Sequence, residues 1–265
     1  MNYFFAFIKQ SFKESTKSRV VFFINIFGKI IFFIINFYLW QAIFNYDGRG
    51  VINGLTMEET INYMLFVSIM YGLLSTNIHR IVMKDVKNGY INIKLLRPLD
   101  YGLGHLAMAL GQNIYSFFLE IIPSLIIAIF FFNFKIYGIF YFLLSFISFF
   151  LAIILNFFID LNFSLINFKF IDTYSAVNFA KSVFKSLFSG EIVPLNFFPQ
   201  IMQQIFKFLP TTYLFYTPIM IYLGKLSGAD IILSFIFQLI FIIFFYAIYK
   251  FFWKMLTKSF EGVGV

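Results

Sequence analysis

Long apolar runs separated by short charged segments dominate the pattern of this chain. A helix needs about 20 mostly apolar residues to cross a bilayer. The runs that meet or approach this length are Val20–Phe44, Thr60–Ile78, Met108–Phe132, Tyr137–Phe163, Tyr174–Ser189 and Ile231–Phe252. They are continuous, whereas the strands of a membrane barrel alternate apolar and polar residues. The pattern therefore predicts an all-α, polytopic membrane protein with six transmembrane helices.

The fifth run is the shortest, and it contains Lys181 and Lys185. Composition supports the membrane assignment, because 61% of the residues are hydrophobic and only 12% are charged. A soluble domain has about 25% charged residues. The chain has no cysteine, which excludes disulfides and thiolate metal sites.

The distribution of lysine and arginine predicts the orientation of the spans. Cytoplasmic loops of membrane proteins carry an excess of these residues. Thirteen lie on the side of both termini, namely Lys9, Lys13, Lys17, Arg19, Arg80, Lys84, Lys87, Lys94, Arg97, Lys169, Lys250, Lys254 and Lys258. The other side has four, namely Arg49, Lys135, Lys207 and Lys225. We therefore expect both termini in the cytoplasm, and we interpret the net charge of +8 as a topology signal rather than a nucleic-acid surface.

The first 19 residues precede the first span and predict an interfacial amphipathic helix. Phe4, Phe5, Ile8 and Phe12 share one helical face, and the lysines lie elsewhere. Apolar and basic faces of this kind lie in the plane of the membrane surface. The alternative is an unstructured basic tail.

Two connecting segments are too long to be simple turns. Residues 79–104 alternate charged and apolar positions on the cytoplasmic side, and long loops in compact proteins tend to be functional. The alternative is a solvated loop that only sets topology. Residues 190–228 on the outer side are apolar but broken by four prolines, which disrupt helices. Because irregular backbone cannot face lipid, this segment predicts re-entrant or interfacial helices packed against the protein.

Candidate chemistry in the chain is limited to ionisable residues inside the spans. Such residues are costly and are usually functional or paired. Lys29 and Glu120 lie at similar depths, and so do Asp160 and Lys181 on either side of a turn near Ile171. Each pair is expected either to fix helix packing or to lie in a transport path. We predict no catalytic constellation, no nucleotide-binding loop and no metal site in this chain.

Two motifs, in order, resemble the six-span permeases of type-2 ABC exporters. The stretch from Asn88 to Pro98 contains Gly89 followed by Leu95-Leu96-Arg97-Pro98, similar to the segment after the second span of that family. The outer segment is similar to the family's outer signature through Gly190, Glu191, Pro194, Phe198, Pro199, Pro210 and Pro218. The departures are Asn88, where a small residue is common, and Thr211-Thr212, where an aromatic residue often follows.

The resemblance implies a single transmembrane domain over residues 1–265 that moves a substrate across the cell membrane. A separate ABC ATPase would bind ATP and Mg²⁺ and dock on the loop helix and the N-terminal helix, and a second permease chain would complete the path. The expected coupling residues are Val82, Lys84, Asp85, Val86, Lys87, Gly89, Leu95, Arg97 and Pro98. Lys84, Asp85 and Lys87 would offer charges to the partner, and Val82 and Val86 would pack on the spans. The alternative from another class is a channel or ion-coupled carrier that uses the four intramembrane charges.

Overall fold

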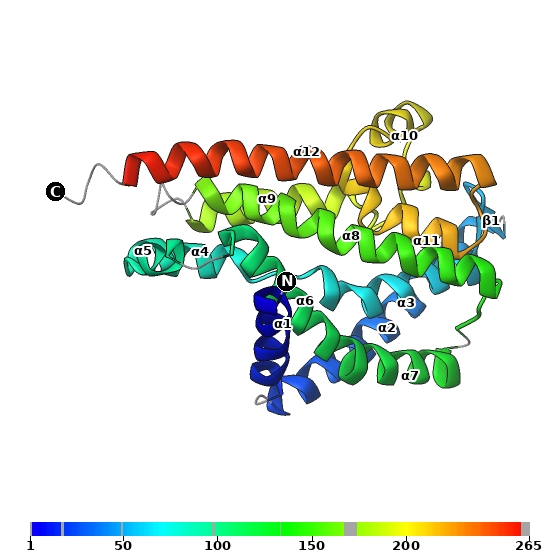
Figure 1. Ribbon diagram of the computed structural model, residues 1–265. Coiled ribbons are helices and arrows are strands. Elements are labelled where there is room, and N and C mark those ends of the chain that lie inside the picture. Colours follow the sequence, from blue (N-terminus) through cyan, green and yellow to red (C-terminus); the bar gives the residue numbers. More distant parts are fainter. Residues whose placement is uncertain are drawn as a thin grey trace.

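A computed structural model describes residues 2–16, 19–48, 50–96, 99–132, 134–166 and 174–260. It is a bundle of long helices, with short elements at its two ends (Figure 1). The long helices are α2 (Arg19–Asp47), α3 (Met57–Leu74), α6 (Tyr101–Ser116) continued by α7 (Ile122–Phe132), α8 (Ile139–Leu165), α9 (Tyr174–Phe188) and α12 (Gly228–Phe260). The short ones are α1 (Asn2–Ser15), α4 (Ile78–Lys87), α5 (Tyr90–Leu95), α10 (Gln200–Phe206) and α11 (Tyr216–Tyr222).

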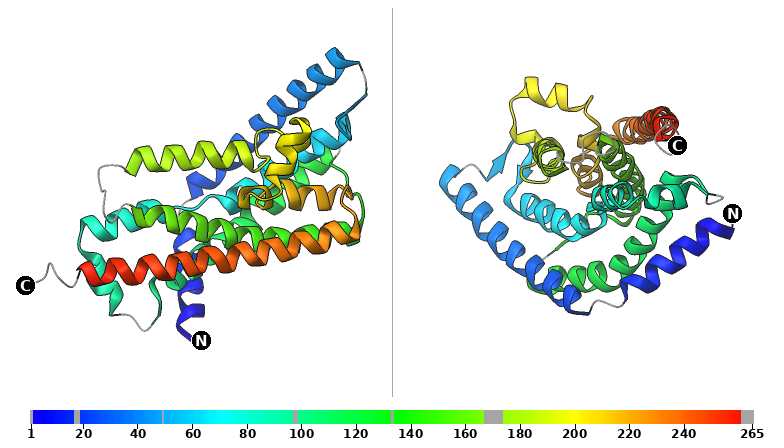
Figure 2. Two further views of the ribbon diagram at one scale, coloured as in Figure 1. Left: turned by 90° about the horizontal axis from the view of Figure 1, so that it is seen from above. Right: turned by 90° about the vertical axis from the view of Figure 1, so that its left-hand side faces the viewer.

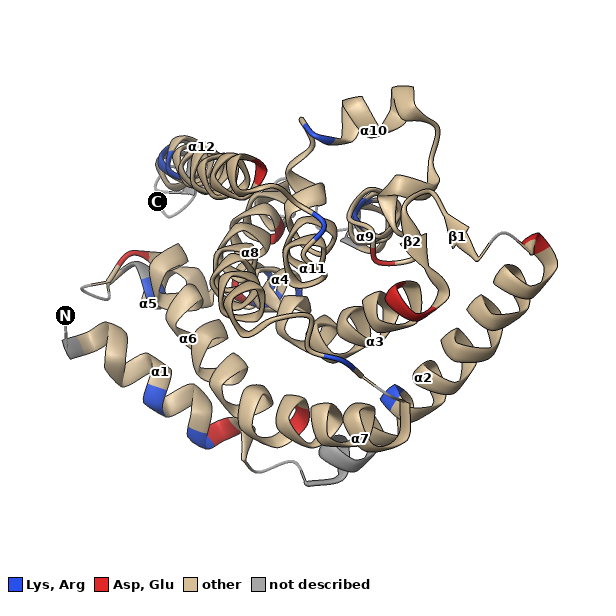
Figure 3. Ribbon diagram, turned by 90° about the vertical axis from the view of Figure 1, so that its right-hand side faces the viewer, with Lys and Arg blue, Asp and Glu red and all other residues tan. Residues whose placement is uncertain are grey.

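Five helical segments in the described part of the chain are long and apolar enough to cross a membrane. They correspond to every predicted span except the fifth, and an all-α polytopic membrane protein is thereby confirmed. Helix α9 has only 15 residues, so the count of six stays a prediction. Charged residues are sparse along the helices (Figure 3). One two-stranded hairpin, β1 (Val51–Ile52) with β2 (Leu55–Thr56), precedes α3.

The third span begins earlier than predicted and contains an irregular turn. Asp100 caps α6 by accepting a hydrogen bond from the Leu103 N–H at 3.1 Å, so the helix starts at Tyr101 instead of Met108. Between α6 and α7 lies a π-helical turn, Phe117–Ile121, that includes Glu120. It ends two residues before Pro123, which has no N–H for an ordinary helical hydrogen bond. Such turns are frequent at functional sites.

The short elements cluster at opposite ends of the bundle. Helices α4 and α5 lie at one end with the C-terminal end of α12, and the hairpin lies at the other (Figures 1 and 2). This separation agrees with alternating loops on the two sides of a membrane. The buried core lies between these two ends. It includes Tyr63, Phe66 and Ile69 of α3 and Ile219 and Tyr222 of α11, all almost fully buried.

Helix α1 crosses the bundle axis and packs against α6 (Figure 1). An orientation across the bundle is the one expected of an interfacial helix. Phe5 is 61% exposed, as a side chain that enters the membrane surface would be, and the amphipathic face stays a prediction. On the side of α6, Ser11 is buried and Phe12 meets Tyr115 edge to face.

Gly111 allows the close approach of α1 and α6, and this leads to our first mutational prediction. A Cβ at Gly111 would overlap the Ile8 carbonyl and lie 2.9 Å from Ser11 Cβ. Gly111→Ala should therefore displace α1. Because the chain has no native cysteine, a Ser11→Cys reporter measures this as faster reaction with a thiol reagent. Gly104→Ala on the same helix is the control, since its Cβ would find only Leu99 Cδ2 at 3.7 Å. Equal labelling of the two variants would contradict the prediction.

Candidate functional site

The cytoplasmic segment forms two short helices separated by Gly89. This glycine has φ +67°, and the Asn88 N–H donates to the Lys84 carbonyl at 3.0 Å, so α4 ends here as predicted. Val82 is fully buried and Val86 is half-buried, whereas Lys84 and Lys87 are exposed. Leu95 closes α5. Arg97 and Pro98 lie outside the described residues.

The prediction that Asp85 presents its charge to a partner is wrong, because this side chain is buried. Its side chain is 4% exposed and accepts hydrogen bonds from Lys94 Nζ at 2.5 Å and the Tyr101 hydroxyl at 2.7 Å. His105 Nε2 lies 3.6 Å away. Asp85 is buried because it follows Val82 by three residues and therefore lies on the same inward face of α4. Asp85 thus joins α4 to α5 and α6.

Asp100 fixes the next corner, where α6 meets α12. The Tyr249 hydroxyl donates to Asp100 Oδ1 at 2.9 Å, and Lys250 Nζ donates to Oδ2 at 2.8 Å. Burial alone would raise the pKa of this carboxyl, but the hydrogen bonds from Lys250, Leu103 N–H and Tyr249 outweigh it and lower the pKa below its usual value. The resulting stabilisation is full above the ordinary carboxyl pKa and is lost as pH falls through the lowered one.

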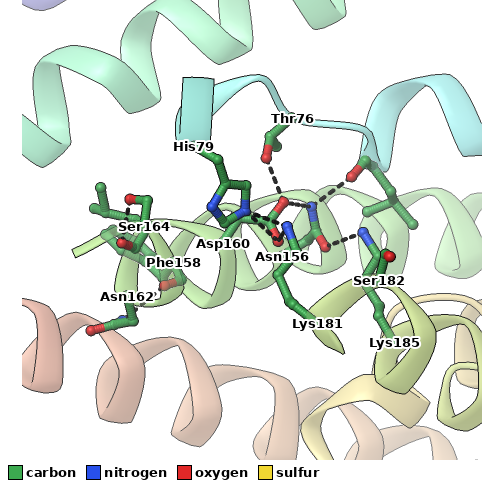
Figure 4. Close-up of polar contacts among 12 residues, drawn as sticks. Thr76, His79, Asn156, Phe158, Asp160, Asn162, Ser164, Lys181, Ser182 and Lys185 are labelled. Atoms are coloured by element: carbon green, nitrogen blue, oxygen red, sulfur yellow. Dashed lines mark hydrogen bonds and ion pairs between the residues drawn. The ribbon is translucent and has the colours of Figure 1, made fainter. Parts of the chain in front are cut away.

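The structure brings together Asp160, near the C-terminal end of α8, and Lys181, in the middle of α9. Asp160 is 1% exposed, and Lys181 Nζ donates to its Oδ1 at 2.8 Å (Figure 4). The Thr76 hydroxyl and Asn156 Nδ2 donate to the other oxygen, the latter at 3.3 Å. His79 also contacts Lys181. The network therefore ties the α3–α4 junction to α8 and α9.

Sequence reasoning missed three members of this network: Thr76, His79 and Asn156. Their positions in the sequence could have indicated these contacts. His79 directly follows the predicted second span, and Asn156 precedes Asp160 by one helical turn.

Lys29 and Glu120 also meet, across α2 and the π-helical turn. Lys29 Nζ lies 3.5 Å from Glu120 Oε2, and both side chains are about 90% buried. Asn25 Nδ2 donates to the other carboxylate oxygen at 3.2 Å. The Lys29 ammonium donates no hydrogen bond within the described residues, so this pair is looser than the pair of Asp160 and Lys181.

The outer segment folds into short helices whose starts follow its prolines. Pro194 and Pro199 immediately precede a 3₁₀ turn (Leu195–Phe197) and α10, Pro210 begins a second 3₁₀ turn, and Pro218 lies in the first turn of α11. The first N–H groups of a helix have no intrahelical partner, so proline costs little there. Phe198 packs edge to face on Phe206.

Gly190 and Glu191 connect this segment to the spans. The Tyr63 hydroxyl of α3 donates to the Gly190 carbonyl at 2.8 Å. Glu191 accepts a hydrogen bond from the Ser186 hydroxyl at 3.1 Å. The outer motif is thus held directly against α3 and α9.

These features define a polytopic helical membrane protein with buried ion pairs and docked short helices, and with no metal cluster among its described residues. The sequence profile of the ABC-2 family transporter proteins matches residues 17–264, and the chain belongs to that family. It is accordingly a membrane transport subunit of the ABC type. None of the curated proteins compared with the chain matches it.

Proposed function

We propose that the chain is the permease subunit of an ABC exporter in the cell membrane. It has six spans when α9 is included, both termini in the cytoplasm, and a translocation path completed by a second permease chain. A separate ABC ATPase binds ATP and Mg²⁺ and drives the motion. Permeases of this family work with ABC ATPase subunits, which supports this division of labour.

The observation that carries the proposal is an exposed apolar patch on α5 and the residue that follows it, defined by Tyr90, Ile93 and Leu96. These side chains are 52%, 62% and 86% exposed. The patch lies at the end of the bundle that also holds α4 and the C-terminal end of α12 (Figure 1). Exposed apolar patches rimmed by charge mark protein–protein contacts. On the adjacent α4, Lys84 and Lys87 are exposed and can supply such charges.

The α4–α5 unit can also transmit motion. Asp85 fixes α4 to α5 and α6, and the Asp160 network fixes its start to α8 and α9. A partner that moves the patch would therefore move several spans, because charge-assisted hydrogen bonds resist separation.

The test is removal of the patch without removal of packing. Ile93→Asp with Leu96→Asp should abolish copurification of an ABC ATPase and substrate-stimulated ATP hydrolysis, while the permease still inserts. Ile201→Asp with Phe208→Asp is the matched control, because these outer residues are 75% and 71% exposed. Wild-type assembly in the first variant would refute the proposed docking site, and failure of the wild-type chain to bind any ATPase would refute the proposed function.

A further inference from the structure

A cavity of about 700 Å³ lies between α2 and α3, and Glu120 and Glu191 also line it. Small-molecule sites commonly have volumes of about 300–1,000 Å³. Its wall on α2 runs from Ile24 to Leu39, about 22 Å at about 1.5 Å per residue. The cavity is therefore long enough to hold an extended amphiphile. Its lining does not include Tyr90, Ile93 or Leu96 of the α5 patch.

Most of the wall is apolar or aromatic. Phe32 and Leu39 of α2 face Val67 and Tyr71 of α3, and Tyr71 is 51% exposed. Gly28 widens the middle, because nothing lies within 4 Å of the position where its Cβ would be. A ligand that fits here needs a large hydrophobic surface.

The charges of the wall are unbalanced toward the negative. Lys29 is the single cation of the lining, and it lies beside Glu120. Glu191 has no ion-pair partner within 4.0 Å among the described residues, since nearby Lys185 donates to Asn156 Oδ1 instead. Two carboxylates against one ammonium attract a cation, and the faces of Tyr71 and Phe32 add a cation–π contribution.

We infer that this cavity binds lipophilic cations, the positive group beside Glu191 and the apolar body along α2. The inference rests on the proposed function and names its substrate class. It does not depend on the ATPase, because binding is a property of the permease alone.

The test uses two probes of the same shape and opposite charge, tetraphenylphosphonium and tetraphenylborate. Binding of each is measured to the full chain in phosphatidylcholine nanodiscs, with empty nanodiscs subtracted to remove partitioning into lipid. The wild-type chain should show saturable binding of the phosphonium and none of the borate. Glu191→Gln should weaken phosphonium binding about tenfold, the effect of about 1.4 kcal/mol of lost interaction. Glu58→Gln, on the outer surface and outside the cavity, should leave it unchanged.

A second variant tests the volume of the cavity without changing its charge. Gly28→Leu should reduce phosphonium binding, and it should not unfold the protein because leucine is the better helix former by about 0.8 kcal/mol. Saturable borate binding that Lys29→Met removes would overturn the inference in favour of anions. Equal binding of both probes, insensitive to Glu191→Gln, would show a lipid-filled groove and overturn it as well. Cation binding by a chain that assembles with no ATPase would refute the proposed function and leave this site intact.

Discussion

Replacement of Asp160 by leucine should be among the most destabilising single substitutions in this chain, with a loss of about 3–5 kcal/mol. The carboxylate accepts hydrogen bonds from Lys181, Thr76 and Asn156, and His79 Nε2 lies 3.8 Å from it. Leucine leaves the Lys181 ammonium, which is 8% exposed, without its counter-ion. An unpaired buried charge destabilises the protein by more than the intact ion pair stabilises it. Asp160→Leu alone should therefore lose more stability than a variant that removes both charges.

A double-mutant cycle separates this effect from lost packing. Asp160→Leu with Lys181→Met removes both charges and should recover a large part of the stability lost in Asp160→Leu. Asn162→Leu on the same helix is the control, because it removes hydrogen bonds to the Phe158 and Phe245 carbonyls but no charge, at about 1 kcal/mol. Unfolding in detergent measures all of these variants. A double variant as unstable as the sum of the two singles would show that the pair is not coupled.

The apolar runs predicted the long helices well because bilayer thickness imposes a length on each span. Their ends were less predictable, because helix termini depend on capping and not on hydrophobicity. Asp100 illustrates this, since its cap starts α6 seven residues before the predicted Met108. Helix α9 illustrates the reverse, because its run contains Lys181 and Lys185 and falls short of a full span.

The candidate charges were predictable as pairs but not as networks. Equal depth in neighbouring spans brought Lys29 to Glu120 and Lys181 to Asp160, and depth follows from counting residues. Partners such as Asn156 depend on the rotation of each helix, which an almost wholly apolar helix such as α8 hardly encodes. Helix α4 is amphipathic, so its sequence does encode its rotation. The prediction of an outward-facing Asp85 was wrong because it overlooked that Asp85 follows Val82 by three residues and shares its buried face.

Gly190→Ala should also strongly destabilise the protein, by about 2–6 kcal/mol from two independent causes. Gly190 has φ +81°, a conformation that costs an alanine about 1–3 kcal/mol. A Cβ there would also overlap the Tyr63 hydroxyl and lie 2.9 Å from Tyr216 Cβ, and overpacking costs about 1–3 kcal/mol. The substitution would push the outer segment away from α3.

Gly224 separates the two causes because it shares the backbone strain without the crowding. Its φ is +66°, yet the nearest atom to an added Cβ, in Tyr141, would lie 3.5 Å away. Gly224→Ala should therefore lose only the backbone contribution. Adding Tyr63→Phe to Gly190→Ala removes the overlapping hydroxyl and should recover part of the stability lost to crowding. The hydrogen bond from Tyr63 to the Gly190 carbonyl is lost as well. Thermal unfolding in detergent ranks the variants. If Gly190→Ala were no less stable than Gly224→Ala, the outer segment would not pack on Tyr63 as described, and the contact that holds Glu191 at the cavity would have to be sought elsewhere.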